Sequence, residues 1–329
     1  MQTVVELSRL RHNVRRIKAK TGNGFCAVVK AQAYGHGATV AHAVENLSDC
    51  FFVATFDEAT ELIYGGIRKP VLVLGGDISP YLTHRNNLIV PTVSDARQLS
   101  ALINAGYKNF SVAVNTGMNR YGANEIELNK IVDICKAENT PPLTVYSHIY
   151  DGLYSAPEQA KEFDRLTTDP ILRGCRHLYS SCALGIVGNK YDLTRAGLAM
   201  YGYSDETDMC MRVRAKITAI NRVPYGSHIG YGNKTLDRDR LVATVSCGYA
   251  DGLRRCDGLY MRVRGVKCEV LAICMDACMI DVTDAPCRPC EFAYLIYDES
   301  DALFLADKYN TIIYEVLTSF NGRAERIYL

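Results

Sequence analysis

The sequence predicts an α/β protein: a (β/α)8 barrel of the TIM type, followed by a second domain built mainly from β-strands. Two observations indicate this order. From residue 25 to residue 204, short apolar runs alternate with segments of helical periodicity, which is the pattern of parallel strands joined by helices. After residue 205 closely spaced strands follow one another, separated by Asp-Gly, Arg-Gly and Pro turns. We therefore expect a barrel over residues 1–205 and a mainly-β domain over residues 206–329.

Eight short apolar runs are the candidate strands of the barrel, and a barrel of this type needs eight strands with helices between them. Ser94 follows one of these runs and is expected to cap the next helix, because its hydroxyl can accept a hydrogen bond from the first turn. The candidate strands are Phe25–Val29, Phe51–Thr55, Val71–Leu74, Leu88–Val93, Phe110–Val114, Thr144–His148, His177–Ser181 and Leu198–Tyr201, and the candidate helices include Asp57–Tyr64, Ser94–Ala105, Glu125–Ala137 and Ala156–Leu166.

The second domain shows period-two alternation in its first long segment and short strands after it, and a helical segment near Asp301–Lys308 precedes the C-terminus. Its candidate strands are Cys210–Pro224, Leu241–Cys247, Tyr260–Val263, Glu269–Ile273, Cys278–Val282 and Phe292–Ile296.

Composition excludes several classes of function. The formal net charge of +1 gives no electrostatic case for binding nucleic acid or an anionic membrane surface. No run approaches the roughly 20 apolar residues of a membrane span, and the N-terminus lacks a signal-peptide pattern, so we expect a cytoplasmic protein. The 13 cysteines lie in apolar runs, as expected for reduced thiols, and the C-x-x-C at residues 287–290 is interpreted as a turn, with no metal expected.

The run VVKAQAYGHG, residues 28–37, is the most informative feature of the chain. It places Lys30 at the end of a buried strand and before a glycine-rich turn, where α/β barrels carry their catalytic groups. A lysine held there loses hydration, so its pKa falls and its amine can form a Schiff base with a carbonyl compound. The alternative for a single lysine is that it merely ends the strand and reaches solvent.

This run resembles the cofactor-lysine motif of alanine racemases, K-A-[DN]-A-Y-G-H-G, from which Gln32 is a small departure. Alanine racemases are fold-type III enzymes that use pyridoxal 5′-phosphate (PLP) and consist of a barrel followed by a β-domain, so the resemblance covers nearly the whole chain. It implies that Lys30 anchors the cofactor and serves as the base on one face of the substrate. It also implies that Tyr34 contacts the cofactor phosphate.

The second base implied by the resemblance is Tyr231 in the segment SHIGYG, where glycines on both sides suit a tight loop. Tyrosine ordinarily ionises near pH 10, so such a base needs nearby cations that stabilise its phenolate. The resemblance assigns that linkage to His148 and Arg195. Arg195 would also face the pyridine nitrogen of PLP, and a guanidinium does not give up its proton readily, so that nitrogen stays unprotonated and proton return is favoured.

Three further residues complete the implied cofactor site, because the backbone amides of Gly197 and Leu198 and the hydroxyl of Ser181 would cradle the phosphate.

The segment VNTGMNRYG, residues 114–122, resembles the family motif V-D-T-G-M-x-R-x-G. It implies that Arg120 bonds the phenolic oxygen of PLP and helps to hold the substrate carboxylate. Two departures stand beside it: Ala113 replaces a lysine that the family commonly carries as a carbamate, and Asn115 replaces the aspartate. Arg120 therefore lacks its usual anionic partner, for which a chloride or water near Asn115 can substitute, or activity is reduced.

Two segments of the second domain, SCGYADG (246–252) and ICMDACM (273–279), resemble further family motifs. They imply that Tyr249 narrows the substrate entrance, that the Met275 amide binds the substrate carboxylate and that Asp276 supports Tyr231 and the entrance. In the family these residues reach the active site of the neighbouring subunit. The resemblance thus implies a homodimer with shared active sites, with Lys30 and Tyr231 contributed by different chains.

The function expected from these motifs is a PLP-dependent racemase that interconverts L- and D-alanine with Lys30 and Tyr231 as its two bases, supplying a D-amino acid for peptidoglycan. The alternative is a serine or broad-specificity racemase. Gly322, or Asn321 if the alignment shifts by one residue, stands where many alanine racemases have a tyrosine, and the C-terminal segment resembles serine-racemase domains of the glycopeptide-resistance type. A non-catalytic PLP-binding protein is a further alternative, because Ala113, Asn115 and Gly322 depart from the family pattern; a decarboxylase of basic amino acids fits the motifs less well.

Overall fold

The computed structural model describes residues 1–152, 154–178, 181, 190–232, 234–320 and 322–329. The chain forms two compact units. The N-terminal unit consists of Leu10–Ala33 and Ala38–Asp208, and the C-terminal unit of Met1–Arg9, Tyr34–Gly37 and Met209–Leu329. The C-terminal unit thus takes in two short segments that the sequence places in the first domain.

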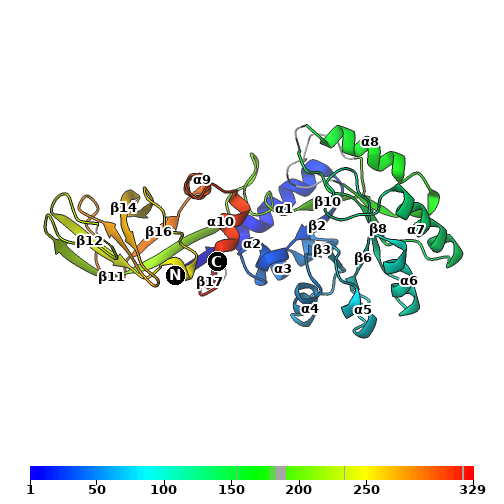
Figure 1. Cartoon of the computed structure of the whole chain (residues 1–329), viewed down its shortest axis with the longest axis horizontal. Coiled ribbons are helices and arrows are strands. Elements are labelled where there is room, and N and C mark those ends of the chain that lie inside the picture. The colour runs from blue at the N-terminus through cyan, green and yellow to red at the C-terminus, as the bar shows by residue number, and fades with distance from the viewer. Residues whose placement is uncertain (153, 179–180, 182–189, 233, 321) are drawn as a thin grey trace. The chain divides into compact units, whose positions relative to one another are not determined.

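The N-terminal unit alternates parallel strands with helices, and Figure 1 shows α4 to α8 along the outside of its strands. A five-stranded sheet has the order β10-β2-β3-β4-β5 and a four-stranded sheet the order β6-β7-β8-β9, and neighbouring strands in both are parallel. Pro91 alone separates β5 from β6. The strands are β2 (Gly24–Val28), β3 (Cys50–Val53), β4 (Val71–Val73), β5 (Ile89–Val90), β6 (Thr92–Val93), β7 (Ser111–Ala113), β8 (Thr144–Tyr146), β9 (Cys175–His177) and β10 (Leu193–Ala196).

Helices of this part bury one apolar face, and several of them begin at a side-chain cap. Thr55 caps α4, where its side chain accepts from the Glu58 amide and the Glu58 side chain accepts in return from the Thr55 amide. The helices and short 3₁₀ turns are α1 (Leu7–Thr21), α2 (Lys30–Tyr34), α3 (Thr39–Val44), η1 (Glu45–Leu47), α4 (Phe56–Tyr64), α5 (Ser79–Thr83), α6 (Ala96–Asn104), α7 (Glu125–Ala137), α8 (Ala156–Leu166) and η2 (Pro170–Leu172).

The structure corrects the cap predicted for α6. Asp95, not Ser94, caps this helix and accepts a hydrogen bond from the Gln98 amide. Ser94 is engaged elsewhere, since its amide donates to the Gln98 side chain and its hydroxyl accepts from the Gly122 amide.

The predicted eighth strand was wrong. The strand is β10, Leu193–Ala196, whereas residues 198–201 form a turn in which the Tyr201 amide bonds the Leu198 carbonyl at 3.1 Å. Both segments are buried, but the turn is the more apolar of the two, and the charged Arg195 in the middle of β10 hides the strand from a pattern based on hydrophobicity.

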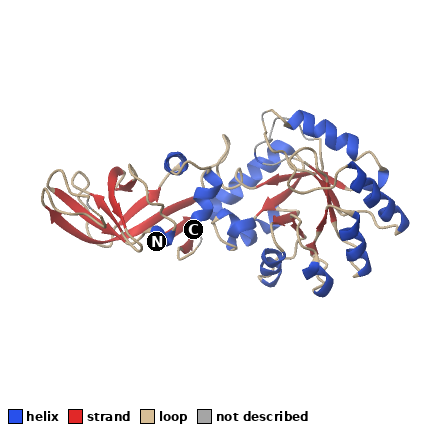
Figure 2. Cartoon of the chain, in the orientation of Figure 1, coloured by secondary structure: helices blue, strands red, loops and turns tan. Residues whose placement is uncertain are grey.

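The C-terminal unit is mainly β-structure, as Figure 2 shows by colour. Its strands follow the order β12-β15-β14-β13-β16-β11-β1-β17, and an additional pairing of β11 with β12 closes six of them into a ring. The N-terminal strand β1 runs antiparallel to β11 and parallel to β17. The elements are β1 (Gln2–Val5), β11 (Met211–Val223), β12 (Arg240–Val245), η4 (Tyr249–Asp251), β13 (Tyr260–Val263), β14 (Val266–Ile273), β15 (Cys278–Asp281), β16 (Phe292–Ile296), α9 (Glu299–Lys308), α10 (Ile313–Ser319) and β17 (Glu325–Tyr328).

None of the helices in the described ranges is long and apolar enough to cross a membrane.

Candidate active site

Lys30 follows strand β2, at the carboxyl end of the parallel sheet. The Val29 amide still bonds the Phe52 carbonyl at 3.0 Å, so the sheet holds the backbone up to the residue before the lysine. Burial lowers the pKa of Lys30, the guanidinium groups of Arg120 and Arg195 lower it further, and the Glu58 carboxylate opposes them. The neutral amine, which is the nucleophilic and basic form, is therefore more accessible here than in a solvated lysine.

The turn that follows Lys30 is left-handed. Residues 31–34 have φ angles between 52° and 55°, a region that L-amino acids with a side chain seldom adopt in succession. The Glu58 carboxylate holds the turn from α4, because it accepts the amides of Ala31 and Ala54, each at 2.7 Å. The Gln32 side chain donates to Glu61 at 3.1 Å. These bonds fix the backbone directly beside the lysine.

Tyr34 and the two glycines of the motif belong to the C-terminal unit. A Cβ at Gly35 would lie 2.2 Å from the Leu317 carbonyl oxygen, so only glycine fits this approach. The Tyr34 ring is buried and lies 5.7 Å from the Tyr314 ring, centroid to centroid. Gly35 is therefore explained by backbone packing against α10, and Gly37 by the side chains of Arg326 and Tyr328 in β17.

Arg195 is the most deeply buried charge of the site, with 2% of its surface exposed. Its Nη2 donates to the Ser147 carbonyl at 2.6 Å and to the Leu178 carbonyl at 3.3 Å. Its Nη1 lies 2.9 Å from Nδ1 of His177, and Nη2 lies 3.4 Å from Nδ1 of His148. Among the described residues, no carboxylate lies within 4 Å of this guanidinium, although buried charges are usually paired.

Two aromatic rings partly replace a carboxylate partner for the Arg195 guanidinium. The guanidinium carbon lies 4.9 Å from the ring centre of Tyr146 and 5.3 Å from that of Phe52. Burial lowers the pKa of Arg195, yet a guanidinium remains charged in proteins.

Both histidines beside Arg195 must be neutral. A guanidinium has donors only, so each Nδ1 accepts and the ring proton sits on Nε2. Burial, and after it Arg195, lowers the pKa of His148 to about 3 and that of His177 well below its ordinary value. The sequence analysis missed His177. Its signal was its place at the end of β9, which matches that of His148 after β8.

Ser181 lies beside the segment that follows β10. The Ser181 hydroxyl accepts the amides of Gly197 at 3.2 Å and Ala199 at 3.1 Å. Leu198 lies between these two donors in the sequence. Two amides converging on one oxygen form a geometry that suits an anion. Residues 179–180 and 182–189, on either side of Ser181, lie outside the described part of the chain.

Arg120 is exposed, and no carboxylate in the described ranges lies within 4 Å of it. The Asn115 side chain is used by its own loop, because its oxygen accepts the amides of Gly117 at 3.0 Å and Asn119 at 3.1 Å. A cavity of about 20 Å³ is lined by Arg120, Ala113 and Asn115, among others. It has room for about one water molecule.

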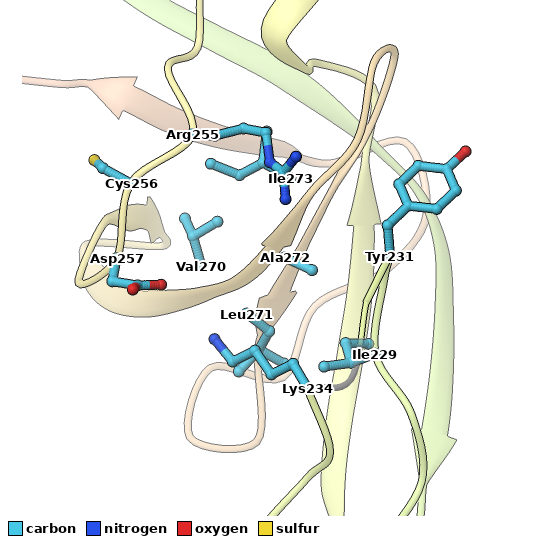
Figure 3. Close-up of a pocket in the computed structure, with 10 residues that line it drawn as sticks. All are labelled: Ile229, Tyr231, Lys234, Arg255, Cys256, Asp257, Val270, Leu271, Ala272 and Ile273. Carbon is cyan, nitrogen blue, oxygen red and sulfur yellow. The ribbon is translucent and has the colours of Figure 1, made fainter.

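Tyr231 lies in the loop between β11 and β12, and 73% of its surface is exposed. Gly230 and Gly232 on either side have φ angles of 69° and 92°, which presents the single side chain outward. A cavity of about 410 Å³ next to the loop is lined by the charged side chains of Lys234, Arg255 and Asp257, and Figure 3 shows the Tyr231 ring directed away from them.

Tyr249, Met275 and Asp276 lie close together in the C-terminal unit. The Tyr249 amide bonds the Cys274 carbonyl at 3.1 Å, and the next amide bonds the Met275 carbonyl at 3.0 Å. Tyr249 and Met275 are 42% and 51% exposed. Asp276 pairs with Arg323 at 2.7 Å, and within the described residues no hydrogen bond joins it to Tyr231. A Cβ at Gly322 would meet no atom within 4 Å, so this position is open, whereas Asn321 lies outside the described residues.

Two family models match the chain: the alanine racemase N-terminal domain over residues 5–205 and the alanine racemase C-terminal domain over residues 210–328. The chain belongs to the alanine racemase family. Its motifs divide between the units in the same way, with Lys30, Arg120, His148 and Arg195 in one and Tyr231, Tyr249, Met275 and Asp276 in the other.

Relatives and solved structures agree with this membership. The chain is 34% identical to an alanine racemase of Clostridium kluyveri, over 99% of this chain and 93% of the relative. It is 33% identical to one of Thermodesulfovibrio yellowstonii, over 100% and 98%. An alanine racemase structure from Clostridium difficile matches with a TM-score of 0.91 and 28% identity, covering 100% and 95%. One from Bartonella henselae with covalently bound pyridoxal phosphate matches with a TM-score of 0.88 and 25% identity, covering 100% and 99%.

The lowered pKa of His148 predicts a pH dependence of stability. Histidine ordinarily titrates near pH 6.5, and His148 in the folded chain near pH 3, so between these values the unfolded chain binds a proton that the folded chain does not. The contribution of neutral His148 to the free energy of unfolding is therefore fully present above about pH 6.5, and it is lost as the pH is lowered towards 3. His148→Gln removes this titration, so its urea midpoint falls less between pH 7 and pH 4 than that of the wild type.

His12→Gln is the control, because His12 is exposed and should leave the wild-type slope unchanged. Equal slopes for His148→Gln and the wild type would show that His148 is not held neutral.

Proposed function

We propose that this chain interconverts L- and D-alanine with PLP as cofactor, and that Lys30 and Tyr231 act as bases on opposite faces of the substrate. The observation that carries the proposal is the half-buried Lys30 amine, whose pKa is lowered by burial and by Arg120 and Arg195. A lysine whose pKa is lowered in this way is both a better anchor for a carbonyl cofactor and a more available base than a solvated lysine.

The residues present fit PLP. Lys30 would anchor the cofactor, and Tyr34, Ser181, Gly197 and Leu198 would hold its phosphate. The amides already converging on the Ser181 hydroxyl support this assignment. Arg195 would face the ring nitrogen, and its buried guanidinium, which has no carboxylate partner in the described part of the chain, supports that role. When bound, PLP delocalises the negative charge that remains after the α-proton leaves.

The chain's own groups then divide the proton transfers. Lys30 takes or returns the α-proton on one face, and Tyr231 does so on the other. Arg195 donates hydrogen bonds without giving up its proton, so it favours return of the proton to the α-carbon over other outcomes. His148 and Arg195 would support the Tyr231 phenolate, and Arg120 with the Met275 amide would hold the substrate carboxylate while Tyr249 and Asp276 shape the entrance.

We further propose that the N-terminal unit is one (β/α)8 barrel and that the functional domains are residues 1–205 and 206–329. The succession of β5 and β6 across Pro91 supports a single strand position, and the Asp192 amide bonds the Arg176 carbonyl at 2.9 Å, which links β9 to the residue before β10. Eight strand positions result. The limits of the two family models support the division into domains.

We propose a homodimer with shared active sites, because in the family the β-domain residues reach the active site of the neighbouring subunit. The high exposure of Tyr231, Tyr249 and Met275 supports a role in receiving a neighbouring subunit. We propose a cytoplasmic enzyme whose D-alanine serves peptidoglycan synthesis. The four relatives and structures named above are all alanine racemases. This agreement favours alanine as the substrate over serine or a broad range of amino acids. The match to both domain models disfavours a PLP-binding protein made of a barrel alone.

Replacing the anchor tests the cofactor site. Lys30→Ala is expected to abolish both the absorbance of bound PLP and racemase activity, because the covalent anchor and one base are lost together. Lys108→Ala, at an exposed lysine of the same unit, should retain both. Retention of absorbance and activity by Lys30→Ala would refute the assignment.

Replacing the second base tests the division of the proton transfers. Tyr231→Phe is expected to slow α-proton exchange by about 10²-fold or more from one alanine enantiomer, and by less from the other, because only one face loses its base. Tyr225→Phe is a matched control in the same loop, with the same 73% exposure, and should exchange both enantiomers normally. Small, equal effects of Tyr231→Phe would mean that another group is the second base.

The experiment that tests the function itself is proton NMR in D₂O with the PLP-loaded enzyme and a panel of L-amino acids. Loss of the α-proton signal of L-alanine, followed by formation of D-alanine, is the expected result. Exchange of L-serine but not L-alanine would assign a serine racemase, and no exchange across the panel with PLP still bound would favour a binding protein.

A further inference from the structure

Arg323 joins two of the motif segments of the C-terminal unit. Its Nε lies 3.2 Å from the Asp251 carboxylate, and its Nη1 lies 2.7 Å from the Asp276 carboxylate. Asp251 belongs to the segment that carries Tyr249, and Asp276 follows Met275 directly. One guanidinium therefore spans both segments through charge-assisted hydrogen bonds.

The two segments touch through their backbones. A Cβ at Gly248 would lie 2.3 Å from the carbonyl oxygens of both Cys274 and Met275, so only glycine fits at this point. The Asp251 carboxylate also accepts the Gly248 amide at 2.9 Å. The position of the Asp251 side chain is thus coupled to the backbone that precedes Tyr249.

Charge explains why a cation is needed here. Asp251 is only 6% exposed, and buried carboxylates are costly unless they are paired. Arg323 supplies a cation to Asp251 and Asp276 together. Its own segment is held against the motif, because a Cβ at Gly252 would lie 2.4 Å from the Ser319 carbonyl oxygen.

We infer that Arg323 is a positioning residue that fixes the Met275 amide and the Tyr249 ring for substrate binding by bridging Asp276 and Asp251. This inference rests on the proposed function, in which Met275 and Tyr249 receive the substrate. Arg323 has no assigned contact with reacting atoms, so its loss should weaken binding of the substrate carboxylate more than it slows the chemical steps.

The test compares Arg323→Gln, Arg323→Lys and a control, all loaded with PLP. Arg323→Gln is expected to raise KM for L-alanine about 5- to 20-fold and to change kcat by less than about 3-fold. The inhibition constant of propionate, which has the carboxylate of alanine without its amine, should rise in parallel. Arg323→Lys should recover part of the loss, because an ammonium can reach one carboxylate but cannot bridge two with a fork. The absorbance of bound PLP should match the wild type in each variant.

Arg264→Gln is the matched control. Arg264 is exposed in the same unit and pairs with Glu291 through two nitrogens, at 2.9 and 2.7 Å, away from the motif segments. It should have wild-type KM. In an Asp276→Asn background, Arg323→Gln should raise KM by a smaller factor, because one of its two partners is already altered.

Values of KM and of the propionate constant within twofold of wild type in Arg323→Gln would overturn the inference. If that variant does not fold, Arg323→Lys decides: a raised KM supports the bridge, and wild-type constants overturn it. If neither the wild type nor Arg264→Gln racemises L-alanine, the proposed function is wrong, and the inference fails with it.

Discussion

The buried guanidinium of Arg195 is the constraint on which the arrangement of the N-terminal site depends. An unpaired charge of this kind costs several kcal/mol when it leaves water. The Ser147 and Leu178 carbonyls, the Nδ1 atoms of His177 and His148, and two aromatic faces satisfy it here. Because these partners accept hydrogen bonds but carry no negative charge, the positive potential of Arg195 is not cancelled. Burial is the main reason that both imidazoles are neutral, and that potential adds to it; the same potential helps to lower the pKa of Lys30.

The N-terminal site therefore carries an excess of positive charge, and this excess makes it suitable for anionic ligands. Lys30, Arg120 and Arg195 act on one another, whereas Glu58 is the one acid among the causes that shift the Lys30 pKa. The Glu58 carboxylate is itself occupied by backbone amides, including that of Ala31. A phosphate and a substrate carboxylate supply the missing negative charge, so cofactor and substrate complete an electrostatic balance that the chain leaves open. Asn115 contributes no charge, which leaves Arg120 available to such an anion.

Local patterns predicted many of the helices and strands. The ends of α7 and α8 and of β13 and β16 agree with the sequence because caps, turns and periodicity define them locally. Strand β1 was missed because its partners, β11 and β17, are far away in the sequence. Strand β10 was missed because it carries Arg195. The left-handed turn after Lys30 has no local signal, since Glu58 and packing impose it, and the role of His177 exists only through its tertiary contact with Arg195.

The protonation of the two histidines beside Arg195 is the measurement that tests this electrostatic arrangement most directly. Nitrogen NMR of the protein labelled with ¹⁵N-histidine, assigned with His148→Gln and His177→Gln variants, reports the charge and tautomer of each ring between pH 5 and pH 8. Both rings should remain neutral with the proton on Nε2 throughout, because each Nδ1 accepts from the guanidinium. A positively charged ring, or a proton on Nδ1 of either histidine, would contradict this electrostatic arrangement. Arg195 would then lack the acceptors that hold its guanidinium in place.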